Sequence, residues 1–117
     1  METIDNNYGY LEMFCLIWLN KNPNENRNSE QKLRSIINNL VQFEDIHQCE
    51  KFIEKSSIKD RIILITTGRL GRELIPRVHS LRQVISIYIY CLDIPANKEW
   101  SSSYPKVSED SLFFSFI

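Results

Sequence analysis

The residues with the clearest chemical potential form the stretch TTGRLG at positions 66–71, between the apolar run IILI and a segment with helical spacing. A strand, a small-residue turn and a helix N-terminus together attract anions, because backbone amides point at the ligand. Hydroxyls, a glycine that permits close approach and two positive charges would build such a site: Thr66, Thr67, Gly68, Arg69 and Arg72. The pattern predicts either a phosphate or nucleotide site or a structural turn that caps a helix.

Two observations weigh on that choice. TTGRLG matches neither G-x-x-x-x-G-K-[ST] nor G-x-G-x-x-G, the two established phosphate-binding patterns. In open α/β sheets, however, ligands bind beyond the carboxyl ends of the strands near the topological switch point. The loop at residues 20–28 (NKNPNENRN) is the other segment expected there, so Asn20 and Asn22 join the candidate ligand-binding residues.

The same positions argue against catalysis. Phosphotransfer needs carboxylates to hold magnesium and an aspartate to accept the phosphoryl group, but the first expected strand ends at Asn20 and the third at Thr66 and Thr67. His47 and Cys49 are two residues apart on an expected helix and point to different faces. We therefore expect no catalytic residue, no aspartyl phosphorylation and no cofactor.

Cysteine usage and composition narrow the class of protein. The three cysteines are far apart, without a C-x-x-C pair, which predicts buried reduced thiols instead of a disulfide framework or metal site. A net charge of -1 gives no overall basic field for nucleic acid. No signal peptide is visible, and the apolar run at residues 13–19 is shorter than the roughly 20 residues that span a bilayer. A cytoplasmic protein without a membrane partner is expected.

Hydrophobic periodicity predicts an alternation of strands and helices. Continuous apolar runs at residues 13–19, 62–65, 84–92 and 112–117, with a shorter one at 41–43, are typical of buried strands. Helical stripes separate them, with Asp45 as the expected N-cap of the second helix and Pro76 as a kink or late start in the third. The last helix is expected at residues 97–104. Trp18 is expected in the core.

This order predicts an α/β domain with three α-β-α layers around a five-stranded, mostly parallel, doubly wound sheet of the flavodoxin or receiver type. Residues 1–12 are expected to form an N-terminal arm and residues 13–117 a single domain. No closing helix follows the last apolar run, LFFSFI. An uncovered terminal strand favours self-association, so we expect a fragment of a longer protein or an interface at that strand.

The segment DRIILITTGRLGRELIPRVHSLRQVISIYIYCLDIPANKEW, at residues 60–100, resembles a poorly characterised receiver-like N-terminal domain of invertebrate multidomain proteins. The resemblance extends back through FEDIHQCEKFI, QKLRSIINNL and CLIWLN. It implies that the domain precedes an arginine-specific ADP-ribosyltransferase domain or tetratricopeptide repeats of the kinesin-light-chain type. The transferase needs a Glu-x-Glu pair, which this chain lacks, so that activity would belong to a neighbouring domain.

Arginines gather on or beside the third expected helix, where they form either a solvated face or a docking surface for an acidic partner. Arg77, Arg82 and Trp100 are the candidate interaction residues; Trp100 could instead cover the sheet edge. The sequence thus favours a non-catalytic regulatory or protein-interaction module, a pseudo-receiver. A small-molecule sensor that binds a phosphate-bearing ligand at residues 66–71 is the alternative, and a nucleotide hydrolase ranks below both.

Overall fold

The computed structural model describes residues 14–21, 31, 39–91, 93–107 and 112–113 of the 117-residue chain. The expected arm at residues 1–12, the candidate residue Asn22 and most of the first expected helix lie outside these residues. The described part contains the strands of a parallel sheet and three helices that pack on it.

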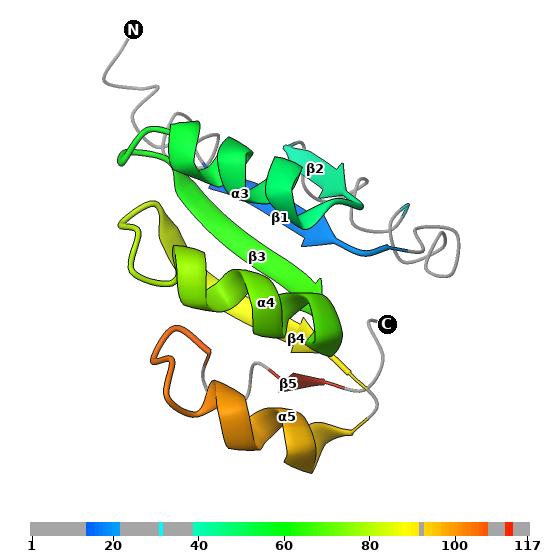
Figure 1. Ribbon diagram of the computed structural model, residues 1–117. Coiled ribbons are helices and arrows are strands. Elements are labelled where there is room, and N and C mark those ends of the chain that lie inside the picture. Colours follow the sequence, from blue (N-terminus) through cyan, green and yellow to red (C-terminus); the bar gives the residue numbers. More distant parts are fainter. Residues whose placement is uncertain (1–13, 22–30, 32–38, 92, 108–111, 114–117) are drawn as a thin grey trace, which may run out of the picture.

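The parallel sheet forms the centre of the domain (Figure 1). Its four main strands lie in the order β2-β1-β3-β4 and all pair in parallel. They are β1 (Phe14–Leu19), β2 (Leu40–Phe43), β3 (Arg61–Thr67) and β4 (Val84–Tyr90). The expected fifth strand at residues 112–117 is described only as the two-residue β5 (Leu112–Phe113), which pairs with the outer edge of β4. The arrangement is α/β and compatible with a flavodoxin-like fold.

Three helices, α3 (Ile46–Lys55), α4 (Gly68–Val78) and α5 (Ile94–Ser101), cover the same face of this sheet (Figure 1). Crossovers between parallel strands are right-handed. The connections β2 to β3, β3 to β4 and β4 to β5 all move across the sheet in one direction, so their helices must lie on one side. This geometry brings the N-termini of the helices to the carboxyl edge of the strands.

Local capping explains where two of the helices begin. Asp45 accepts hydrogen bonds from the backbone amides of His47 (2.7 Å) and Gln48 (3.3 Å), so it is the N-cap that the sequence predicts. The last helix is expected from the sequence at residues 97–104, but α5 begins at Ile94. Asp93 accepts from the amide of Ala96 at 3.1 Å and is followed by a proline in the first turn, a position that suits proline. The helix therefore lies three residues earlier than expected.

Pro76 does not delay the start of α4. The helix begins at Gly68, directly after β3, and runs past the proline to Val78. Leu74, Ile75 and Val78 are fully buried against the sheet. Packing of this apolar stripe stabilises the helix although Pro76 removes one backbone donor near its end.

Two apolar clusters lie on the two faces of the sheet. The larger one joins the sheet to α3, α4 and α5, and a smaller one on the opposite face includes Leu16, Leu40 and Ile65. Trp18 belongs to the smaller cluster and is 1% exposed, as expected for a core residue. The strand β4 is less enclosed than its apolar sequence predicts, because Ile85 and Tyr88 are each 38% exposed.

Candidate functional site

The carboxyl ends of β1 and β3 lie side by side at one edge of the sheet, as the expected topology requires. Leu19 of β1 pairs with Thr66 of β3. The backbone amide of Asn20 donates to the carbonyl of Phe43 on β2 at 2.9 Å. Asn20 is only 3% exposed, so this candidate ligand-binding residue is buried and not open to a ligand from solvent. The other candidate in that loop, Asn22, is outside the described residues.

Thr66 is fully buried and faces α4. Its hydroxyl donates to the carbonyl of Thr67 at 3.1 Å, and its methyl carbon would lie 2.7 Å from a Cβ placed on Gly71. A glycine at position 71 is therefore what allows α4 to pack closely against β3. Thr66 acts here as a packing residue and presents no hydroxyl to solvent.

Thr67 is the N-cap of α4. Its hydroxyl oxygen accepts the backbone amide of Leu70 at 3.3 Å, which satisfies one of the amides that a helix N-terminus leaves without an intrahelical partner. The expected turn between strand and helix is present, but the hydroxyl of Thr67 that would contact an anion instead caps the first turn of α4.

Gly68 lies against the side chain of Asn97 from α5, a contact that the sequence does not predict. A Cβ at position 68 would come within 2.9 Å of Asn97 Cγ. The amide of Asn97 is held at both ends, since its Nδ2 donates to the carbonyl of Asp93 (2.8 Å) and its Oδ1 accepts from the indole nitrogen of Trp100 (3.0 Å). Asn97 therefore covers the glycine through which a ligand was expected to approach.

Arg69 and Arg72 extend from the first turns of α4 and are exposed. Neither forms an ion pair within the part of the chain that the structure describes, and the first turn of α4 contains no acidic residue. Positive side chains at the positive end of the helix dipole are unfavourable by a few tenths of a kcal/mol. These two guanidinium groups are the only predicted ligand-binding side chains that the described structure leaves fully available.

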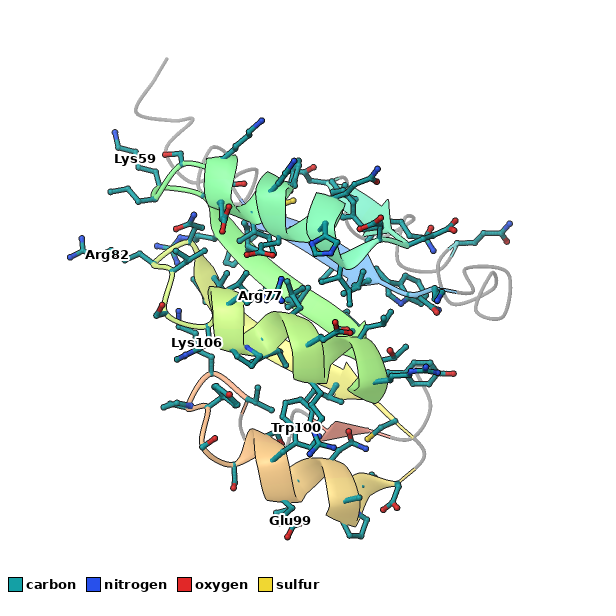
Figure 2. The ribbon with its side chains drawn as sticks, in the orientation of Figure 1. Lys59, Arg77, Arg82, Glu99, Trp100 and Lys106 are labelled. Carbon is teal, nitrogen blue, oxygen red and sulfur yellow. The ribbon has the colours of Figure 1, made fainter. Side chains whose placement is uncertain are left out.

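The three candidate interaction residues have different surroundings. Arg77 on α4 forms an ion pair with Glu50 on α3 at 3.2 Å, near the boundary of the two helices (Figure 2). Trp100 is half-buried, donates to Asn97 and packs edge-on against Tyr104. Only Arg82 projects freely, from the loop before β4.

None of the three thiols has the environment of a reactive cysteine. Burial raises the pKa of Cys15, Cys49 and Cys91, and a nearby carboxylate contributes to each shift; for Cys49 the pKa reaches about 12. All three are free and buried, as the sequence predicts. A cysteine nucleophile would need a pKa below its ordinary value, so these residues serve packing.

Two polar side chains that sequence reasoning missed join distant loops. Gln83 is 4% exposed and donates from Nε2 to the carbonyl of Ile53 at 2.8 Å. Lys106 donates from Nζ to the carbonyl of Leu81 at 2.7 Å, and burial lowers the pKa of its ammonium group. Their partners are 30 and 25 residues away in the chain, so no local sequence signal could have revealed them.

Comparison with family models, curated proteins and solved structures gives no match to this chain. Within the described residues, no helix is both long and apolar enough to cross a bilayer. In the same part of the chain, His, Cys, Asp and Glu side chains do not converge in groups of three or more that could hold a metal ion.

Proposed function

We propose that this chain is a non-catalytic regulatory or protein-interaction module, a pseudo-receiver that serves a protein partner or an attached effector domain. The observation that carries the proposal is the closure of the β3–α4 junction by the chain's own groups. Thr67 caps the first turn, Asn97 covers Gly68, and Thr66 packs under the helix. An α/β domain that bound substrate at this edge would keep its amides and side chains open to the ligand.

The residues at the strand ends support the same proposal. Asn20 and Thr66 are buried and neutral where a phosphoacceptor and its magnesium would need carboxylates. The proposal includes a five-stranded, doubly wound, three-layer fold of the receiver type. The parallel order β2-β1-β3-β4 and the pairing of β5 with β4 are consistent with it.

The absence of phosphotransfer can be tested with acetyl phosphate and Mg²⁺, followed by intact-mass measurement. We expect no phosphoryl adduct and no turnover. A stoichiometric adduct that hydroxylamine removes would reveal an acyl phosphate and would contradict the proposal. The interaction function is tested by sedimentation velocity and cross-linking, because a module of this kind must associate with itself or with a partner.

The second candidate function is a sensor for a phosphate-bearing ligand at the N-terminus of α4. The observation that favours it is the pair of exposed arginines, Arg69 and Arg72, beside a helix N-terminus without a carboxylate in its first turn. Arg69→Ala and Arg72→Ala should then each weaken phosphate binding about tenfold. Arg77→Ala is the matched control, since Arg77 already pairs with Glu50. Equal affinity in all variants would exclude the two arginines as ligands.

The state of the cysteines supports a cytoplasmic location within the same proposal. All three thiols are free, and each is less than a tenth exposed. Proteins from oxidising compartments commonly use their cysteines as disulfides. Localisation of a tagged full-length protein would test this part of the proposal.

A further inference from the structure

Loops from three different helices share one edge of the sheet. The segments that come after α3, α4 and α5 all lie at the amino end of the parallel strands, where Figure 2 shows Lys59, Arg82 and Lys106 in a row. We call the surface formed by these three residues and Ile58 the amino-end rim. It is on the opposite edge from the β3–α4 junction.

The amino-end rim is held as one rigid surface by side-chain hydrogen bonds between its loops. Gln83 joins the second loop to the end of α3, through the carbonyls of Ile53 (2.8 Å) and Ser56 (3.4 Å). Lys106 joins the third loop to the second through the carbonyl of Leu81. Because these loops are already ordered, a partner that binds them does not have to order them, which favours association.

A tight turn presents the most exposed apolar side chain of the rim. The amide of Asp60 donates to the carbonyl of Ser57 (2.9 Å), and the carboxylate of Asp60 accepts the amide of Ser57 (3.0 Å). Ile58 at the centre of this turn is 65% exposed, against 37–38% for the other exposed large apolar residues in the described part of the chain. Turn centres favour glycine, proline, asparagine and aspartate, and Ile58 is largely unburied, so its side chain is available to contact a partner.

Positive side chains share the amino-end rim with this isoleucine. Lys59 and Arg82 are exposed and pair with no carboxylate in the described structure. The carboxylate of Asp60 is already occupied by the turn. An exposed apolar anchor that shares a surface with unpaired positive charges is typical of a binding surface for an acidic partner, because the anchor contributes affinity and the charges contribute specificity and rate.

We propose that the amino-end rim docks a protein partner that offers an apolar pocket bordered by carboxylates, with Ile58 in the pocket and Lys59 and Arg82 paired to the carboxylates. This inference rests on the proposed interaction function and assigns a surface and a partner chemistry to it. The arginines at the start of α4 take no part in it.

Site-specific photo-cross-linking in the native cells tests the proposal on the full chain. The photoreactive p-benzoylphenylalanine replaces Ser80, which is exposed two residues before Arg82 of the rim, and in a matched chain it replaces Lys51, exposed on α3. We expect Ser80→p-benzoylphenylalanine to capture a protein whose cross-linked peptide contains aspartate or glutamate. Ile58→Ser and Arg82→Glu should each lower that yield at least about tenfold. Lys51→Glu, the charge-reversal control, should leave it unchanged.

The outcomes separate this inference from the proposed function. Adducts from Lys51 alone, adducts to nucleic acid, or a Ser80 adduct that survives both Ile58→Ser and Arg82→Glu would overturn docking at the amino-end rim and leave an interaction module in place. If probes at Ser80, at Lys51 and at a third position, Arg72, all give no protein adduct, both this inference and the proposed interaction function are contradicted. Ile58 and Arg82 are exposed, so an unchanged thermal midpoint in their variants will show that the fold is intact.

Discussion

The side chain of Asn97 on α5 lies directly against Gly68, the first residue of α4, so the two helices meet at the edge where a ligand would enter. Hydrogen bonds to Asp93 and Trp100 fix the amide of Asn97 in this position. The contact requires a residue without a side chain at position 68. Packing between the two helices therefore accounts for Gly68 in the TTGRLG turn, without a bound phosphate.

Gly68→Ala should destabilise the domain by about 1–3 kcal/mol, because the new methyl group would overlap the Asn97 side chain. Asn97 would have to move and break its hydrogen bond with Trp100. Chemical denaturation monitored by tryptophan fluorescence measures the loss. Asn97→Ala should relieve the overlap, so Gly68→Ala should cost less in that background. Additive effects in this double-mutant cycle would refute the direct contact.

The second glycine of the turn, Gly71, allows a similar test of its contact with Thr66. In the wild-type background Gly71→Ala should destabilise the domain, because its Cβ would lie 2.7 Å from the methyl carbon of Thr66. Thr66→Ser removes that methyl group. In the serine background Gly71→Ala should cost less, because only the 3.2 Å contact with Ile75 Cδ1 remains close and alanine favours a helix more than glycine does. Equal destabilisation in both backgrounds would mean that Thr66 is not the neighbour that matters.

The buried thiol of Cys49 predicts a loss of stability at high pH. Its pKa is raised in the folded protein to about 12 from an ordinary value of 9.0. Below pH 9 the thiol is protonated in both states. Above pH 9 the unfolded chain loses this proton first, so the free energy of unfolding falls with rising pH, by up to about 1.4 kcal/mol per pH unit from this group.

Urea denaturation between pH 8 and 10.5 measures this dependence in the wild type and in Cys49→Ala. Because other groups titrate in both proteins, the difference between their slopes isolates Cys49. The wild type should lose stability more steeply above pH 9. Parallel curves would show that the folded protein does not hold the Cys49 thiol in its protonated form.

Gln83→Met should cost about 1–3 kcal/mol, because it leaves the carbonyls that Gln83 joins without that donor in a buried position. Gln48→Met is the control, since Gln48 is exposed on α3 and only its backbone contributes to the helix cap. Thermal unfolding compares the two variants. A loss of the same size in both would assign the effect to the methionine and not to the buried hydrogen bonds.

Sequence reasoning succeeded where a local pattern decides the structure. Asp45 and the apolar stripe of α3 are a few residues apart, so capping and periodicity predicted that helix, and the β-branched run of β3 predicted its strand. The start of α5 was predicted three residues too late, at Asn97 instead of Ile94. Asp93 became the cap, and Asn97, which was expected at the start, turned inward onto Gly68.

The candidate site was predicted in its location but not in its role. The topology placed the carboxyl ends of β1 and β3 together, and Leu19 does pair with Thr66. Which residue covers Gly68 depends on how α5 packs beside α4, and this contact between positions 68 and 97 leaves no mark on local spacing. The hydrogen bonds from Gln83 to Ile53 and from Lys106 to Leu81 were missed because they too join residues that are far apart in the sequence.

The most direct test of the central claim is a two-dimensional amide NMR titration of the domain with phosphate, ADP, ATP and NAD. An interaction module whose β3–α4 junction is closed by its own side chains should give a well-dispersed spectrum in which residues 66–72 show no saturable shift, because Thr67 and Asn97 occupy the junction. Saturable shifts confined to those residues, and lost in Arg69→Ala or Arg72→Ala, would contradict it and make the β3–α4 junction a ligand site.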